Sequence, residues 1–346
     1  MKSSRGFRSM DRYSRQSLLR VIGSRGQKKI DNARIAVVGL GALGSAAAQC
    51  LARAGVGEMI LIDRDILELS NLQRQLLYDE SDVDKELPKA VAAKQRLSEI
   101  NSAISLHDHA ESLHAGNIRI LLEGVQLIID GTDNVETRYL LNDYSVSNDI
   151  PWIYGGAIGT NGTGLFVVPG EGPCLRCIFP DPPDAEKLGT CDTVGVLGTV
   201  PVIIGAWQAS MAIRFIVGGR EGLGERIFMV DLWEHGFQEP VVKRRKECPA
   251  CGKGDFPFLR LRRGTVAVSL CGRGAYQVNT AECKTIKLEE ISKRLNGLGE
   301  VDLGPYYLRF SDGRAQMFLF RSGEAQIRGV GSENEALSFY ARYVGL

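Results

Sequence analysis

Three glycines, Gly39, Gly41 and Gly44, have the G-x-G-x-x-G spacing of a phosphate-binding turn. Glycines at this spacing let the backbone approach a phosphate, and the N-terminus of a following helix offers it unpaired N–H groups. Asp63 comes at the end of the next apolar run, where a carboxylate would hold a ribose hydroxyl. The pattern predicts a nucleotide-binding unit, and taken alone it most often indicates NAD or FAD.

Four of the eight cysteines form two C-x-x-C pairs, Cys174 with Cys177 and Cys248 with Cys251. Two such pairs suit a tetrahedral zinc site of four thiolates, and the fold can bring them together across the long stretch between them. Redox-active disulfides are the alternative, and we disfavour them because nothing in the sequence indicates secretion. A closed zinc site stabilises the fold and takes no part in chemistry.

A denser set of polar residues follows the glycines and is more specific than they are. Residues 63–75 have the form D-x-D-x-x-x-x-S-N-L-x-R-Q, and residues 130–134 have the form D-x-T-D-N. On these motifs the sequence resembles the ThiF/MoeB/HesA family, the adenylyltransferases related to ubiquitin-activating enzymes. The resemblance covers roughly residues 12–251, and it implies that the nucleotide is ATP.

The resemblance implies a role for the polar residues of these motifs. Arg74 and Lys89 would neutralise the negative charge that builds on pyrophosphate as it departs. Asn71 and Gln75 would orient the phosphates. A solvated helix residue is the alternative for Lys89, since Pro88 starts a helix well. The remaining nucleotide-binding residues would be Gly39, Gly41, Gly44, Asp63 and Asp65.

Asp133 and Arg15 complete the site that the resemblance implies. Asp133 would coordinate Mg²⁺ on ATP, although it could equally be the N-cap of a helix that starts at Val135. Arg15, in the motif R-Y-S-R, would reach from one subunit towards the ATP phosphates of the other, which implies a homodimer. An ordinary cationic helix start is the alternative for Arg15.

The family also has a structural zinc at the positions of the four paired cysteines. Cys191 is different, because residues 180–195 are rich in Pro, Asp and Gly, which predicts a mobile crossover loop. In some family members a cysteine in this loop forms a covalent acyl bond to the activated partner, and in others it is dispensable. The sequence leaves open whether the Cys191 thiolate attacks an acyl adenylate or is an exposed bystander.

These residues need a doubly wound α/β sheet to bring them together. Short apolar runs at residues 35–38, 58–62 and 125–130 predict buried strands. The alanine-rich residues 42–54 predict the helix after the glycine turn. We therefore expect a Rossmann-like sheet with an antiparallel extension and a zinc knuckle, in an adenylation domain of residues 12–254.

The chain beyond this domain, residues 255–346, predicts a small α+β domain. No motif in it indicates chemistry, so we expect a docking or dimer-stabilising module. Activating enzymes of eukaryotes place a conjugating-enzyme recruitment domain at the same position, which is an analogy of position only. The expected elements are a helix at 288–295, strands at 306–310 and 316–320 joined by a hairpin turn, and a final helix through Tyr343 after a capping box at Ser332.

Composition excludes several classes of function. The 346 residues carry 42 Lys and Arg against 41 Asp and Glu, so no charge excess indicates nucleic acid or an anionic membrane.

Residues 1–11 are polar and basic, which predicts a disordered start without a signal peptide, and a cytoplasmic protein. Residues 193–213 are uncharged and about long enough to span a bilayer, but Pro201, Gln208 and several glycines favour a core or subunit-interface helix.

The expected reaction joins AMP to a protein. The C-terminal carboxylate of a small β-grasp protein ending in Gly-Gly would attack the α-phosphate of Mg-ATP, giving an acyl adenylate and pyrophosphate. Sulfur, from Cys191 or an external donor, would then displace AMP, for molybdopterin, thiamine or tRNA thiolation. One alternative is the activation of a ubiquitin-like modifier, with a Cys191 thioester and a conjugating enzyme as partner. The other is an NAD-dependent oxidoreductase or a non-catalytic nucleotide-binding module.

Overall fold

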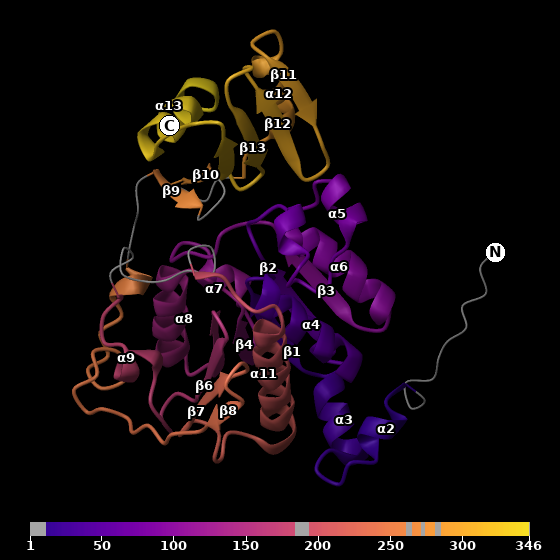
Figure 1. The fold of residues 1–346 in the computed structure, drawn as a ribbon, viewed down its shortest axis with the longest axis vertical. Helices are drawn as coiled ribbons and strands as arrows, with labels where there is room; N and C mark the ends of the chain where they lie inside the picture. The colour runs from indigo at the N-terminus through magenta and orange to yellow at the C-terminus, as the bar shows by residue number, and fades with distance from the viewer. Residues whose placement is uncertain (1–11, 184–193, 261–264, 271–273, 281–284, 346) are drawn as a thin grey trace, which may run out of the picture.

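A computed structural model describes residues 12–183, 194–260, 265–270, 274–280 and 285–345 of the chain. These residues form an eight-stranded sheet and a six-stranded sheet in two stacked domains (Figure 1). Cys191 lies outside the described residues, together with most of the crossover loop that the sequence predicts.

The glycine turn lies inside a β-α-β unit whose bounds agree with those predicted. Strand β1 (Arg34–Val38) leads into helix α4 (Ala42–Ala54) and then into strand β2 (Glu58–Ile62), which pairs with β1 in parallel. Alanine favours the helix and branched side chains favour the strands, so local propensity and fold agree. Gly55 ends α4 with a φ of 86°, a conformation that costs glycine little.

The first sheet is parallel on one side and antiparallel on the other. Its order is β3-β2-β1-β4-β5-β6-β7-β8, with parallel pairs from β3 to β5 and antiparallel pairs from β5 to β8. This confirms the Rossmann-like sheet with an antiparallel extension. The other strands are β3 (Ser105–His109), β4 (Leu127–Asp130), β5 (Trp152–Ile158), β6 (Asn161–Val167), β7 (Ile227–Asp231) and β8 (Gly236–Gln238).

Helices cover both faces of this sheet, and each face has its own core. Side chains alternate along β1, so Ile35 lies in one core and Ala36 in the other. Helices α4, α6 (Lys89–Ile100) and α11 (Thr199–Gly218) pack on the first face, and α8 (Val135–Asn148) packs on the second. The shorter helices are α2 (Ser14–Ser17), α3 (Gly23–Asp31), η1 (Leu69–Asn71), α5 (Glu80–Asp84), α7 (Ile118–Leu121), α9 (Leu175–Ile178) and η3 (Pro257–Leu259).

Helix α11 contains most of the uncharged run for which the sequence allowed a membrane span or a core helix. By length and composition it could cross a membrane, and 39% of its most apolar window is buried. Gln208 in this helix is fully buried and donates to the backbone oxygens of Asp130 at 2.7 Å and Ile153 at 3.0 Å. A buried amide bonded to two strands belongs to a helix packed on a sheet, which is the core position that we expected.

The second sheet forms the C-terminal domain and is antiparallel throughout, in the order β11-β12-β13-β14-β10-β9. The hairpin β12–β13 and both helices confirm the predicted α+β domain, whereas the other four strands were not predicted. The elements are β9 (Val266–Leu270), β10 (Ala275–Asn279), α12 (Leu288–Leu295), β11 (Glu300–Leu303), β12 (Tyr307–Ser311), β13 (Gln316–Phe320), β14 (Ala325–Arg328) and α13 (Glu333–Tyr343).

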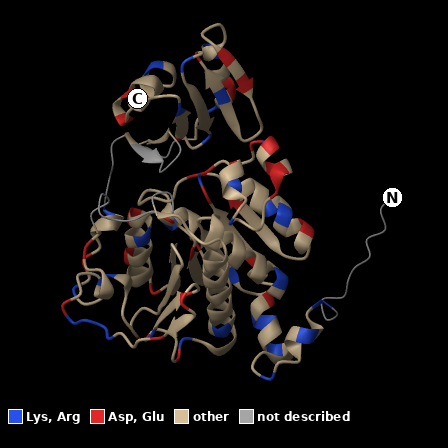
Figure 2. Ribbon diagram, in the orientation of Figure 1, with Lys and Arg blue, Asp and Glu red and all other residues tan. Residues whose placement is uncertain are grey.

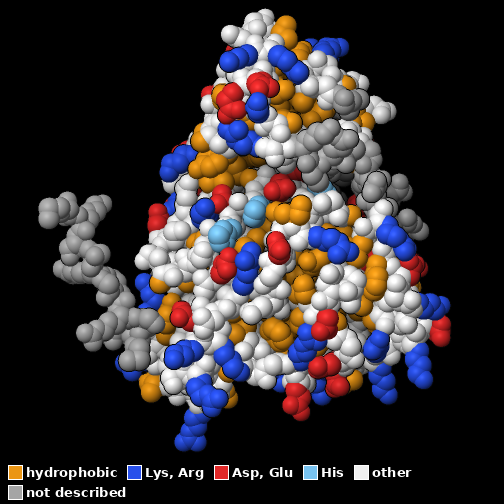
Figure 3. Space-filling view, turned by 180° about the vertical axis from the view of Figure 1, so that it is seen from behind, with side chains coloured by type: hydrophobic (Ala, Val, Ile, Leu, Met, Phe, Trp, Pro, Cys, Tyr) orange, Lys and Arg blue, Asp and Glu red, His pale blue; other side chains and the backbone are white. Residues whose placement is uncertain are grey.

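The two faces of the second sheet have different partners. Phe310 and Leu319 belong to a core that the sheet shares with α12 and α13. On the opposite face, Phe318 and Phe320 pack around Ile66, which follows β2 of the α/β domain. The C-terminal domain therefore stands on the carboxyl edge of the parallel strands, and Figure 3 shows the two stacked domains from behind.

Replacing Phe310 with alanine should destabilise the C-terminal domain. Phe310 is fully buried, and its ring centroid lies 4.6 Å from that of Tyr343. The cavity left by the ring should lower the free energy of unfolding by about 3–5 kcal/mol, measured by urea denaturation. Leu298→Ala is the control, because Leu298 is 60% exposed. Equal stability of the two variants would contradict the core described above.

Candidate nucleotide and zinc sites

The glycine turn lies at the carboxyl edge of the sheet, against the end of β4. A β carbon on Gly39 would lie 2.6 Å from the backbone of Gly131, and one on Gly44 would lie 1.8 Å from the carbonyl oxygen of Gly39. A β carbon on Gly41, the N-cap of α4, would have only Nε2 of Gln75 near it, at 3.8 Å. The turn therefore presents bare backbone and the N-terminus of a helix to open space, which fits a phosphate.

Asp63 organises this turn through its carboxylate. Its Oδ2 accepts a hydrogen bond from the backbone N–H of Leu40 at 2.6 Å, and its Oδ1 accepts one from that of Asp65 at 2.7 Å. Burial raises the pKa of Asp63 above its usual range, although the charge of Lys89 opposes the shift. Each carboxylate oxygen can accept a further hydrogen bond, so the predicted contact with a ribose hydroxyl stays compatible with this geometry.

Lys89 is buried and ion-paired. Its Nζ lies 2.7 Å from Oδ2 of Asp65, and the residue is only 3% exposed. Tyr78 links it to the glycine turn, because the Tyr78 hydroxyl donates to the backbone oxygen of Leu40 at 2.8 Å and lies 3.4 Å from that of Lys89. The alternative of a solvated lysine is therefore wrong, and a cation is fixed beside the turn.

Two buried side-chain amides of the motif at residues 63–75 are incompletely paired. Oδ1 of Asn71 accepts a hydrogen bond from the backbone N–H of Glu68 at 3.2 Å, but its buried Nδ2 has no partner among the described residues. The buried Oε1 of Gln75 likewise has none among them. Arg74, between them in sequence, is half-buried and donates to the backbone oxygen of Ser70 at 3.0 Å. Because an unsatisfied buried polar group costs about 1–3 kcal/mol, a polar ligand would stabilise this arrangement.

Asp130 and Asp133 both follow β4 but have different surroundings. Asp130 is fully buried and its Oδ1 accepts from the backbone N–H of Thr132 at 2.9 Å, while its Oδ2 lies 3.3 Å from Nε of Arg138. Burial raises the pKa of Asp130, although Arg138 opposes the shift. Asp133 is exposed, so a metal ion can reach its carboxylate. The N-cap of α8 is Asn134, so the alternative role of Asp133 as N-cap is wrong.

Arg138 is a residue of this region that sequence reasoning missed. It donates to the backbone oxygens of Thr132 at 2.6 Å and Gly155 at 3.0 Å, and its guanidinium lies 5.0 Å from the ring centroid of Tyr154. Arg138 thereby joins the end of β4 to β5. A signal existed in the sequence, because a residue four positions after the N-cap of α8 faces back towards the end of the preceding strand.

The structure places most predicted nucleotide residues at one edge of the sheet and Arg15 elsewhere. Arg15 lies exposed on α2, which precedes α3, and α3 leads into the amino end of β1 (Figure 1). Arg15 is thus at the opposite edge from the site of its own chain. The residues at the carboxyl edge are Gly39, Gly41, Gly44, Asp63, Asp65, Asn71, Arg74, Gln75, Lys89 and Asp133.

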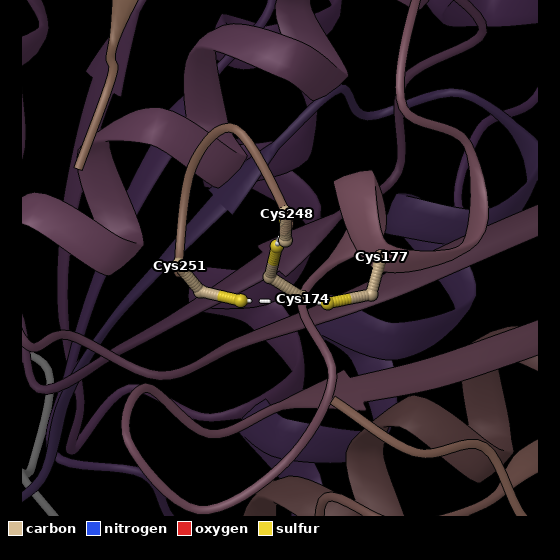
Figure 4. A group of neighbouring side chains, drawn as sticks. All are labelled: Cys174, Cys177, Cys248 and Cys251. Atoms are coloured by element: carbon tan, nitrogen blue, oxygen red, sulfur yellow. Dashed lines mark hydrogen bonds between the residues drawn. The ribbon is translucent and has the colours of Figure 1, made fainter. Parts of the chain in front are cut away.

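The four paired cysteines converge in one cluster (Figure 4). The sulfur atoms of Cys174 and Cys248 lie 3.5 Å apart, those of Cys177 and Cys251 lie 3.4 Å apart, and all four lie within 4.8 Å of one another. Tetrahedral zinc with Zn–S bonds of about 2.3 Å separates its sulfur ligands by roughly 3.8 Å. The cluster therefore fits zinc, and none of the four cysteines is in a disulfide.

Basic residues and backbone N–H groups surround this cluster. The backbone N–H of Arg245 lies 3.4 Å from the sulfur of Cys177, and the Arg244 side chain donates to the backbone oxygen of Cys251. Residues 243–246 form a basic run just before the second knuckle (Figure 2). Four thiolates on Zn²⁺ carry a net negative charge, so these cations and N–H donors suit a metal-bound cluster.

Comparisons with known proteins agree with this geometry. The model of the ThiF family matches residues 13–250. The chain is 40% identical over 339 residues to the sulfur carrier protein ThiS adenylyltransferase of Bacillus subtilis, covering 96% of this chain and 99% of that protein. It is 36% identical to the SAMP-activating enzyme E1 of Haloferax volcanii, covering 71% of this chain and 90% of that protein. A crystal structure of E. coli MccB with ATP superposes with a TM-score of 0.61 at 25% identity, covering 70% of this chain and 74% of that one.

Replacing Cys248 with serine should abolish stable zinc binding. Cys248 is fully buried in the cluster, so the loss of one thiolate leaves an incomplete tetrahedron. Atomic emission spectroscopy of the purified chain should find about one zinc per chain before the change and far less after it. Cys50→Ser is the matched control, because Cys50 is exposed and outside the cluster. Full zinc content and an unchanged melting temperature in the Cys248 variant would contradict the assignment.

Proposed function

The chain belongs to the ThiF family, and from this premise we propose that it uses Mg-ATP to adenylate the C-terminal carboxylate of a small sulfur-carrier protein. The observation that carries the proposal is a pair of buried, unpaired amide atoms: Oε1 of Gln75, whose amide lies beside the bare glycine turn, and Nδ2 of Asn71, one helical turn before it in sequence. A donor and an acceptor at this place suit a polyphosphate and its bound water. The reaction is that of an adenylyltransferase.

Side chains and backbone would divide the work of holding the triphosphate. Backbone N–H groups at Gly41 and the first turn of α4 would bind phosphate oxygens, and the amides of Asn71 and Gln75 would orient them. Arg74 and Lys89 would neutralise the charge that develops on the leaving pyrophosphate. Because the ion pair with Asp65 already fixes Lys89, its ammonium group would not have to move as charge develops on pyrophosphate.

Two carboxylates would complete the nucleotide site. Asp133 would hold Mg²⁺, because it is exposed at the strand edge, and Mg²⁺ binds through one or two carboxylates while keeping several waters. The bound ion would supply further neutralisation of phosphate charge. Asp63 would hold the ribose hydroxyl while keeping its two backbone hydrogen bonds.

The chemical step would need positioning more than acid–base catalysis. The attacking carboxylate is already ionised at neutral pH, so no general base is required. One of its oxygens would form a bond to the α-phosphorus while the bond from that phosphorus to the bridging oxygen of pyrophosphate breaks. The chain would contribute by aligning the two reactants and by placing cations at the leaving group.

A homodimer would bring Arg15 of a second subunit to the nucleotide site. Arg15 lies at the opposite edge from the site of its own chain, so it would act in the site of a second subunit. Large apolar side chains close to Arg15 are exposed in the single chain, as expected of a surface that a second subunit covers. These are Leu18 at 72%, Leu19 at 53% and Val21 at 79% exposure.

The aligned lengths of the two relatives favour a sulfur carrier over a ubiquitin-like modifier as the substrate. The ThiS adenylyltransferase of Bacillus subtilis aligns over 96% of this chain, whereas the SAMP-activating enzyme aligns over 71%. The first match includes the C-terminal domain, so that domain gives no support to recruitment of a conjugating enzyme. Cys191 or an external donor would bring sulfur to the acyl adenylate. Membership of the family removes the alternative of an NAD-dependent oxidoreductase.

We further place this enzyme in the cytoplasm. The four clustered cysteines are thiols that suit zinc, and free thiols are typical of a reducing compartment.

Replacing Gly41 with alanine should weaken ATP binding without destabilising the fold. A β carbon there meets only the Gln75 amide at 3.8 Å, but it would stand on the surface offered to the phosphates. We expect an unchanged melting temperature and a higher dissociation constant in calorimetric titrations with Mg-ATP. Gly44→Ala should instead lower the melting temperature, because its β carbon would collide with the backbone of Gly39. Unchanged ATP affinity of the Gly41 variant would contradict the placement of the phosphates.

Replacing Arg74 with alanine should abolish ATP–pyrophosphate exchange. Loss of one donor that stabilises developing charge costs about 100- to 1,000-fold in rate. The assay would use the ThiS protein of Bacillus subtilis as carrier, at the same concentration for each variant. Arg321→Ala is the control, since Arg321 pairs with Glu289 within the C-terminal domain. Full exchange by a folded Arg74 variant would refute the assigned role.

A further inference from the structure

The C-terminal domain contacts two chain segments that carry the nucleotide residues, in addition to its contacts with Gln95 and Ser112 of the α/β domain. The first segment, residues 64–68, lies between Asp63 and Asn71, and the second, around Glu86, leads to Lys89. One face of the six-stranded sheet makes the contacts with both segments. Part of the contact between the two domains, which Figure 3 shows stacked, therefore lies on the nucleotide motifs themselves.

The first contact fixes the backbone directly after Asp63. Ile66 is 2% exposed and packs in one cluster with Phe318 and Phe320 of β13. The side chain of Gln326, itself 2% exposed, donates to the backbone oxygen of Arg64 at 3.1 Å. Apolar burial and a buried hydrogen bond together hold this segment against the second sheet.

The second contact connects the C-terminal domain to Asn71 through one residue, Glu68. A guanidinium nitrogen of Arg328 lies 3.0 Å from Oε1 of Glu68. The backbone N–H of Asn71 donates to the backbone oxygen of Glu68 at 2.9 Å and, in a capping box, to the Glu68 carboxylate, while Oδ1 of Asn71 accepts the backbone N–H of Glu68 at 3.2 Å. This capping box fixes the turn η1, and the Arg328 guanidinium, 5.0 Å from the ring centroid of Phe318, is itself held against the sheet.

The third contact fixes the segment that leads to Lys89. Arg309 pairs with the Glu86 carboxylate at 3.0 Å, and the Tyr307 hydroxyl donates to the backbone oxygen of Glu86 at 3.2 Å. Glu86 has a φ of 49°, which an L-residue adopts rarely. The chain then turns towards Lys89, whose backbone N–H donates to the backbone oxygen of Asp65 at 2.8 Å.

We propose that Arg328 is a positioning residue for ATP, which acts through Glu68 to hold Asn71 in place. The proposal rests on the proposed function, in which Nδ2 of Asn71 contacts the nucleotide. The geometry favours this route because Glu68 bonds Asn71 through its backbone N–H, its backbone oxygen and, in the capping box, its carboxylate, and Arg328 fixes that carboxylate. Without that guanidinium the carboxylate can turn towards water, and the turn that carries Asn71 loosens. The C-terminal domain thus forms an outer support of the nucleotide site.

The test is calorimetric titration of Mg-ATP into the full chain and its variants. Arg328→Met should weaken binding by roughly tenfold, below the 100-fold that a 1 Å misplacement can cost. Arg328→Lys, which keeps the charge, should restore part of the affinity. Arg321→Met is the control and should bind normally, because Arg321 pairs with Glu289 within the same domain, away from the motif. Melting temperatures report whether each variant is folded.

A second variant separates the route through Glu68 from a general loss of stability. Glu68→Gln keeps the size of the side chain and removes its charge, so it should weaken binding even if Arg328→Met does not fold. If Arg328 acts through Glu68, the double variant should bind no more weakly than Glu68→Gln alone, whereas additive losses would overturn this route. Normal binding by Arg328→Met and Glu68→Gln would overturn the inference and leave the proposed function standing. No binding by the unaltered chain would overturn the proposed function instead.

Discussion

The proposed nucleotide site depends on how closely three stretches of backbone approach one another at the end of the parallel strands. Gly39, Gly44 and Gly131 touch without side chains, and Gly131 donates its N–H to the backbone oxygen of Val38 at 2.7 Å. Any β carbon at these positions would push α4 away from β1 and β4. Because the backbones meet, the acidic side chains that follow β2 and β4 are brought to one edge beside the N-terminus of α4.

Around that contact the polar side chains are arranged in two ways. Asp63 and Asp65 are satisfied within the chain, by backbone N–H groups and by the buried Lys89. Asn71 and Gln75 are each left with an unpaired atom among the described residues. A buried charge pair gives a rigid frame at a high desolvation cost, and the unpaired amides give that frame an affinity for a polar ligand. The C-terminal domain adds to this rigidity because it binds the segments that lead into both groups.

Local sequence patterns predicted correctly those elements in which the intrinsic propensity of the residues matches their burial in the fold. The alanine-rich α4 and the apolar β2 have the expected bounds, because propensity and burial favour the same structure there. Strand β10 was missed since both faces of its sheet are covered, so that Gln277 is fully buried and the apolar–polar alternation is lost. The pair of Arg328 with Glu68, 260 residues apart, has no local signal, because only the packing of the domains creates it.

The cysteine cluster constrains the order in which the chain can fold. Cys174 and Cys248 are 74 residues apart, and the stretch between them includes the whole of α11. Closing a loop of that length in a disordered chain costs on the order of 4 kcal/mol of entropy. The metal therefore gains most of its affinity after the sheet has brought the two knuckles together. During synthesis on the ribosome a zinc ion could complete its coordination only once Cys251 has emerged, so it would close the α/β domain at a late step and would not nucleate it.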